Sequence, residues 1–134
     1  MLIPANLLAQ SIQEKKADSY YLNLSYSKAA GVYESLHTKY PTNGKYIQRL
    51  TYCYGKMLNY KKALLYYSSL IQMQERQTED YYEYAQLLRI DGNVEESKKW
   101  LEKYIELVPD DKRAQKQYNQ INELVSLKEK IKRV

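Results

Sequence analysis

The chain has 134 residues, of which 44% are hydrophobic, with four Gly and three Pro. This is enough for the core of one domain and argues against a loop-rich β architecture, while one cysteine and one histidine exclude an internal disulfide and a His/Cys metal cluster. The net charge of +5 arises wholly in residues 112–134, because basic and acidic residues cancel in residues 1–111.

The first nine residues are apolar and rich in small side chains, and the chain turns polar at Ser11. This pattern is typical of the last part of a secretory signal, with a cleavage neighbourhood from Ala5 to Ala9. We therefore expect residues 1–9 to be a signal remnant or an artificial start, and the protein to be exported. The alternative is an ordinary first helical turn in a cytoplasmic protein that starts at Met1. No segment is apolar over a length that could span a membrane.

The sequence predicts three pairs of helices, each pair joined by a short turn. The expected helices are 10–23 and 26–39, 44–57 and 60–73, and 78–90 and 93–107, in repeats that span 10–43, 44–77 and 78–111. Ser25, Asn59 and Asn93 precede the second helices, where their side chains are expected to accept a hydrogen bond from a free backbone N–H. Gly92 is expected to end a first helix in the left-handed conformation.

Residues 112–134 are expected to form a capping helix, at about 111–130, and a linker. The helix has an apolar stripe at steps of four and three, with Leu124 beside it, formed by Ala114, Tyr118, Ile121 and Val125. One narrow stripe is typical of a helix that covers the end of a repeat stack. The seven basic and two acidic residues of the segment are interpreted as a solvated face. The alternatives are a site for an acidic partner, for nucleic acid or for anionic lipid.

A shift of 34 residues superimposes the three helix pairs. The shift aligns small residues within the first helices, namely Ala17, Thr51 and Ala85. It also aligns small residues within the second helices, namely Ala29, Ala63 and Ser97, and the larger residues Tyr33, Tyr67 and Leu101 in the same helices. Small residues at such positions predict a close approach of the two helices in each pair. The period and these positions resemble the tetratricopeptide repeat over about residues 10–109. The resemblance implies an all-α, right-handed superhelical solenoid of three helix-turn-helix repeats plus a C-terminal capping helix.

The chain departs from the family pattern at Leu24 and Leu58, because the family favours Gly there. A left-handed residue other than Gly costs roughly 1 kcal/mol, so these two turns are expected to deviate from the family geometry. Cys53, in the middle of a first helix, is expected to be a small buried hydrophobe.

In this family the first helices line a concave groove that binds extended peptides or helices. Carried onto this sequence, the candidate contact residues are Tyr21, Lys45, Gln48, Arg49, Tyr52, Lys56, Tyr82, Gln86 and Arg89, with the acidic Glu14, Asp18, Glu79 and Glu83 beside them. The three tyrosines either grip a partner or pack between neighbouring helices. Glu14 and Asp18 replace the basic and amide residues with which chaperone-tail binders clamp a carboxylate, so that subgroup is not expected.

The resemblance implies a scaffold for other proteins, with no cofactor, no metal, no nucleic-acid partner and no direct insertion into a membrane. An enzyme is not expected, because His37 has no catalytic partner at a recognisable spacing. The run from Ala17 to Ala29 is similar to the opening of bacterial OmpA-family envelope proteins, including a component of the type IX secretion machinery. That similarity implies a periplasmic role in assembling an envelope or secretion complex, with peptidoglycan bound only by a domain outside this chain. The alternative is a cytoplasmic adaptor of the same fold.

Overall fold

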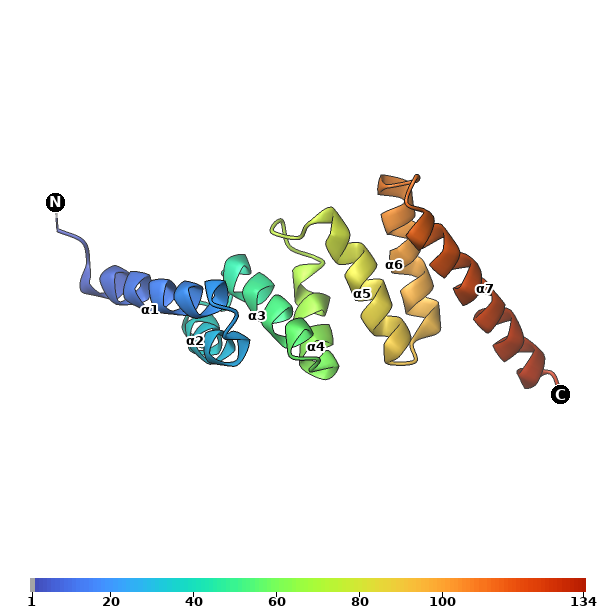
Figure 1. Cartoon of the computed structure of the whole chain (residues 1–134), viewed down its shortest axis with the longest axis horizontal. Helices are drawn as coiled ribbons and strands as arrows, with labels where there is room; N and C mark the ends of the chain where they lie inside the picture. Colours follow the sequence, from blue (N-terminus) through green and yellow to red (C-terminus); the bar gives the residue numbers. More distant parts are fainter. Residues whose placement is uncertain (1) are drawn as a thin grey trace. The chain divides into compact units, whose positions relative to one another are not determined.

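The computed structural model describes residues 2–134, and every regular element in that range is an α-helix (Figure 1). The seven helices within the described range are α1 (Ala5–Leu22), α2 (Tyr26–Lys39), α3 (Gly44–Lys56), α4 (Tyr60–Leu70), α5 (Thr78–Ile90), α6 (Val94–Leu107) and α7 (Lys112–Lys132). The chain forms two compact units, the first ending at Glu75 and the second spanning Arg76–Val134. The expected all-α fold of helix-turn-helix repeats is confirmed.

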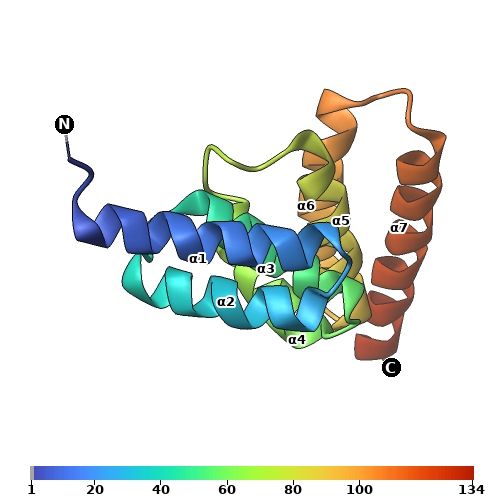
Figure 2. The same cartoon turned by 60° about the vertical axis from the view of Figure 1, so that its left-hand side comes forward.

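Each unit is built from helix hairpins. In the first unit α1 pairs with α2, α3 pairs with α4, and α2 packs against α3 (Figure 2). In the second unit α5 pairs with α6, and α7 packs against α6. The seventh helix therefore covers the last hairpin, as its apolar stripe predicts.

Small residues lie where the two helices of each hairpin meet. Ala17, Ala29, Ala63 and Ala85 are fully buried, and so is Ser97. The Ser97 hydroxyl donates a hydrogen bond of 2.6 Å to the backbone carbonyl of Ala85, which satisfies the polar atom inside the core. The predicted close approach of paired helices is confirmed.

The three hairpin turns have the same backbone geometry. Leu24, Leu58 and Gly92 all have positive φ, at 61°, 58° and 89°. The next residue in each turn donates its backbone N–H to the carbonyl five residues earlier: Ser25 to Tyr20, Asn59 to Tyr54 and Asn93 to Leu88. This is the Schellman motif, which needs a left-handed residue at the position that Leu24, Leu58 and Gly92 occupy. The left-handed conformation expected of Gly92 is confirmed, whereas the expected deviation at Leu24 and Leu58 was wrong, because both take the same left-handed conformation.

Two of the three predicted side-chain caps are present. Asn59 accepts from the backbone N–H of Lys62, and Asn93 accepts from that of Glu96. The prediction for Ser25 was wrong, because its side chain makes no capping hydrogen bond. The backbone angles at Ser25 and Asn59 are similar. The Asn amide reaches the third N–H of its helix at 3.3 Å, and the shorter Ser side chain does not.

The helix ends differ from the expected ones in three places. Helix α1 begins at Ala5, so the apolar residues expected to precede the first repeat continue its helix. Helix α4 ends at Leu70 rather than 73, and α7 continues to Lys132. Helix ends are set by local capping, and small apolar residues such as Ala5 to Ala9 suit both a signal and a first helical turn.

In the first unit, the hydroxyls of three buried tyrosines donate hydrogen bonds to carboxylates. Each ring is at most 6% exposed, and each hydroxyl donates a hydrogen bond to an acidic side chain; the pairs are Tyr33–Asp18, Tyr46–Glu14 and Tyr54–Glu34. Burial and the bond to Glu14 raise the pKa of Tyr46 to about 12. A phenylalanine could fill the same space but could not make these bonds, which gives the tyrosine-rich composition a structural role.

Cys53 is fully buried, and burial raises the pKa of its thiol to about 11. The thiol is therefore protonated at neutral pH and acts as a small hydrophobe, as expected. None of the helices in residues 2–134 combines the length and the apolar character that crossing a membrane requires.

Candidate functional site

Helix α3 has one open face. Seven of its thirteen residues are buried: Gly44, Tyr46, Ile47, Leu50, Thr51, Cys53 and Tyr54. Apart from Gly55, the residues that are not buried are Lys45, Gln48, Arg49, Tyr52 and Lys56, which we call the α3 strip. Steps of three and four place these five side chains on one face of the helix. The sequence predicted all five as partner contacts.

Arg49 is held in place by an aromatic ring from the neighbouring first helix. Its guanidinium carbon lies 4.3 Å from the centre of the Tyr21 ring, and Tyr26 meets that ring edge-on at 5.8 Å. Burial raises the pKa of Tyr21, against the opposing effect of the Arg49 charge. The Tyr21 ring thus packs between α1, α2 and α3 and orients Arg49, whose Nε is buried without a hydrogen-bond partner.

Lys45 and Gln48, at the beginning of the α3 strip, already interact with other residues of the first unit. Lys45 Nζ forms an ion pair of 3.0 Å with Asp18 Oδ2. Burial raises the pKa of Asp18, but the hydrogen bonds from Tyr33 and Lys45 outweigh it, so the pKa lies below its ordinary value. Gln48 donates to the backbone carbonyl of Glu75 at 3.2 Å. These side chains therefore have partners already.

The end of the α3 strip is open. Tyr52 is 49% exposed, although most tyrosines of the chain are buried or half-buried. Lys56 follows one turn later and is also exposed. A half-exposed ring between Arg49 and Lys56 offers an apolar surface together with hydrogen-bond donors. Such a combination suits the binding of a polypeptide, and it contains no nucleophile paired with a base.

The remaining predicted contacts lie on α5, in the second unit. Tyr82 is only 6% exposed, because its ring packs against Tyr104 at 5.4 Å and under the Arg113 guanidinium at 3.9 Å. Gln86 and Arg89 are half-buried and bonded to each other, with Arg89 Nη2 donating to Gln86 Oε1 at 3.2 Å. The Tyr82 ring therefore packs between helices, which was one of the two roles that the sequence left open.

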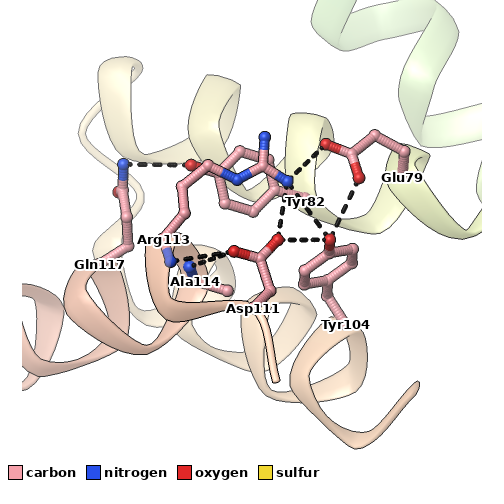
Figure 3. Close-up of polar contacts among 7 residues, drawn as sticks. All are labelled: Glu79, Tyr82, Tyr104, Asp111, Arg113, Ala114 and Gln117. Atoms are coloured by element: carbon pink, nitrogen blue, oxygen red, sulfur yellow. Dashed lines mark hydrogen bonds and ion pairs between the residues drawn. The ribbon is translucent and has the colours of Figure 1, made fainter. Parts of the chain in front are cut away.

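A polar network centred on Arg113 joins α7 to α5 and α6 (Figure 3). Arg113 Nη2 lies 2.8 Å from both Glu79 Oε1 and Asp111 Oδ2. The Tyr104 hydroxyl lies 2.7 Å from Asp111 Oδ2 and 3.1 Å from Glu79 Oε2. Asp111 also caps α7 by accepting from the backbone N–H of Arg113 and Ala114. The hydrogen bonds from Arg113 and Tyr104 hold the pKa of Asp111 well below its usual range.

Sequence reasoning missed this network, although one signal was available. Glu79 and Arg113 are 34 residues apart, so they occupy equivalent positions in α5 and α7, which are one repeat length apart. Their opposite charges could have indicated a contact between α5 and α7. The network uses its charges to attach α7, so it is a structural element of the second unit.

No group of three or more His, Cys, Asp or Glu side chains in residues 2–134 is placed to hold a metal ion.

The comparisons with known proteins agree with the fold. Residues 49–111, just under half of the chain, match the family described as "YpiA-like, C-terminal tetratricopeptide repeats". No curated protein sequence matches the chain significantly.

Several solved structures have a similar fold. The MamA protein has a TM-score of 0.74 and 14% identity, over 87% of this chain and 63% of its own. The second TPR domain of human RPAP3, solved with an HSP70 peptide, has a TM-score of 0.66 and 17% identity, over 85% and 96%. The Yersinia enterocolitica type III secretion chaperone SycD, solved with a peptide of the translocator YopD, has a TM-score of 0.63 and 20% identity, over 96% and 99%. The chain is therefore a helical-repeat protein with the tetratricopeptide fold.

Proposed function

We propose that this chain is a protein-interaction scaffold that binds a peptide or helix of a partner protein along the α3 strip. One observation carries the proposal: on a helix that is otherwise buried, the open face displays Tyr52 half-exposed beside an oriented Arg49. Tyr and Arg, together with Trp, are enriched among the residues that dominate the energy of protein interfaces. Proteins of this fold, the human RPAP3 domain and SycD among them, have been solved with peptides bound.

The chemistry of the strip indicates what its partner offers. The exposed ring of Tyr52 can cover an apolar side chain or lie against a peptide backbone. Arg49 and Lys56 present only donors, so the partner supplies backbone carbonyls or carboxylates. A chaperone-tail clamp is not proposed, because the acidic Glu14 and Asp18 stand at its positions and already bind Tyr46 and Lys45.

The proposal is tested by a double variant, Tyr52→Ala with Lys56→Glu. Neither side chain is buried, so the fold should persist. The matched control, Tyr60→Ala with Lys61→Glu, makes the same changes at exposed residues of α4. Both variants and the unchanged protein would be used to capture partners from extracts of the source cells, and the affinity for each recovered protein would then be measured.

We expect the double variant on α3 to weaken the binding of a specific partner by roughly thirtyfold, which corresponds to about 2 kcal/mol for the loss of one dominant contact. The control on α4 should bind as the unchanged protein does. Equal binding by all three proteins would show that the α3 strip is not the site.

The proposed setting is the bacterial periplasm, in the assembly of an envelope or type IX secretion complex. The apolar residues 1–9 and the similarity of the run from Ala17 to Ala29 support this part of the proposal. N-terminal sequencing of the native protein tests the export step, since an exported protein would lack residues near 1–9. An intact Met1 in native protein from the cytoplasm would instead support the alternative, a cytoplasmic adaptor that binds a peptide or helix.

A further inference from the structure

The C-terminal half of α7 carries a second apolar stripe, separate from the one that packs on α6. Leu124, Leu127 and Ile131 are 46%, 55% and 74% exposed. Successive helical residues are about 100° apart, so these three lie within about 60° of one another. The buried stripe, which includes Ala114 and Ile121, lies about 120° away around the same helix. The outer stripe therefore faces away from the core of the unit.

Basic side chains flank the outer stripe. On the same helical geometry Lys128 and Lys130 lie about 70° and 90° to either side of its centre. Lys132 and Arg133 follow at the end of the helix; of the two acidic residues, Glu129 lies on the opposite face and Glu123 lies on the Lys130 side, about two turns before it. Lys128 pairs with Glu95 at 3.5 Å. Lys130, Lys132 and Arg133 take part in none of the ion pairs found in residues 2–134.

The charge and the chemistry of the stripe decide which partner fits. A second copy of the chain is disfavoured, because it would place one strongly basic segment against another. Nucleic acid would meet the lysines but leave the aliphatic side chains exposed, since the stripe has no aromatic ring on which a base could stack. Three aliphatic residues are also few for a specific protein interface, which needs about 1,000 Å² of well-matched surface.

An anionic lipid surface can bind both the aliphatic stripe and the basic side chains beside it. Aliphatic side chains on one helix face enter the boundary between headgroups and acyl chains, and lysines beside them reach the anionic headgroups. We infer that the C-terminal half of α7 binds the surface of an anionic lipid membrane, with Leu124, Leu127 and Ile131 toward the acyl chains and Lys128 and Lys130 at the headgroups. The contact is peripheral and uses only residues of the second unit.

Vesicle binding by the whole chain tests the inference. Binding would be measured by co-sedimentation with vesicles of phosphatidylcholine alone, and with vesicles that contain an equal amount of phosphatidylserine. Leu124→Ser with Leu127→Ser removes most of the stripe, and Lys130→Glu reverses one flanking charge. The matched control, Lys99→Glu, makes the same charge change on α6, where the side chain is well exposed. Circular dichroism would verify that each variant is folded.

The unchanged chain should bind the vesicles that contain phosphatidylserine and not those of phosphatidylcholine alone. Each basic charge near such a surface contributes about fivefold in binding, so Lys130→Glu should weaken binding by about 25-fold and Lys99→Glu by much less. The double Ser variant should weaken binding at least tenfold. Equal binding to both kinds of vesicle, or equal losses in the two Lys variants, would overturn the inference. So would full binding by the double Ser variant.

Discussion

Replacing Tyr33 by Phe removes one hydroxyl from the core of the first unit. The Tyr33 ring is fully buried, and its hydroxyl donates to the Asp18 carboxylate, whose other oxygen accepts from Lys45 at 3.0 Å. Tyr33→Phe leaves the ring packing in place. It also leaves Asp18 with one protein partner fewer, in a position where the side chain is still 35% exposed.

The expected loss of stability follows from the hydrogen-bond partners of Asp18. A hydrogen bond to a charged group contributes about 1.5–3 kcal/mol net. Because Asp18 is partly exposed, water can replace part of the lost bond, and Lys45 still pairs with it. We therefore expect Tyr33→Phe to lower the free energy of unfolding by about 1–2 kcal/mol.

Urea unfolding followed by circular dichroism measures this change as a shift of the midpoint. Combining Tyr33→Phe with Asp18→Asn in a double-mutant cycle isolates the energy of the pair. Tyr20→Phe, at a half-buried tyrosine of α1, serves as the control and should cost little. A loss below about 0.5 kcal/mol for Tyr33→Phe, or strictly additive effects in the cycle, would refute the reasoning.

Three further changes test the packing, a turn and the polar network. Ala63→Leu should overpack the second hairpin and cost about 1–3 kcal/mol, seen as a lower melting temperature, because Ala63 is fully buried. Leu58→Gly should raise the melting temperature, because it removes a left-handed cost of roughly 1 kcal/mol at an exposed residue. The depressed pKa of Asp111 means that its contribution to stability is present above pH 4 or so and is lost as the pH falls toward its folded pKa. Asp111→Asn should therefore flatten the acid branch of a stability–pH curve.

Each of these expectations has a result that would contradict it. An unchanged melting temperature for Ala63→Leu would mean that the paired helices do not meet at Ala63. Leu65→Gly is the control for the turn, because Leu65 is similarly exposed but lies inside α4 and should be destabilised by glycine. A loss of stability in both glycine variants would show that Leu58 is not strained. An acid branch of equal slope in Asp111→Asn would exclude the carboxylate as its source.

Much of the fold was predictable because it is local and repeated. The 34-residue period placed Ala17, Ala63 and Ser97 at the helix contacts, and Gly92 indicated a left-handed turn between the helices of the third hairpin. Backbone geometry at such positions depends on a few neighbouring residues. The residues of the α3 strip were identified from the resemblance to the tetratricopeptide family, in which the first helices line a groove, and three- and four-residue steps place them on one face of the helix.

The parts that the sequence did not predict depend on which side chains meet across helices. The bond between Tyr46 and Glu14 joins residues 32 positions apart, and nothing in the local pattern selects that partner. For Tyr82 the sequence left open whether the ring grips a partner or packs between helices, and the contact with Arg113 from α7 that decides it is not visible in the local pattern. The beginning of α1 was misplaced because one apolar stretch suits two different structures.

The most direct test of the central claim, that the α3 strip holds a partner polypeptide, is site-specific photocrosslinking in the source cells. A photoreactive phenylalanine analogue would replace Tyr52 in one protein and Tyr60, on α4 of the same unit, in another. We expect a discrete crosslinked partner from position 52 and none from position 60. Crosslinks from position 60 but not from position 52 would contradict the claim.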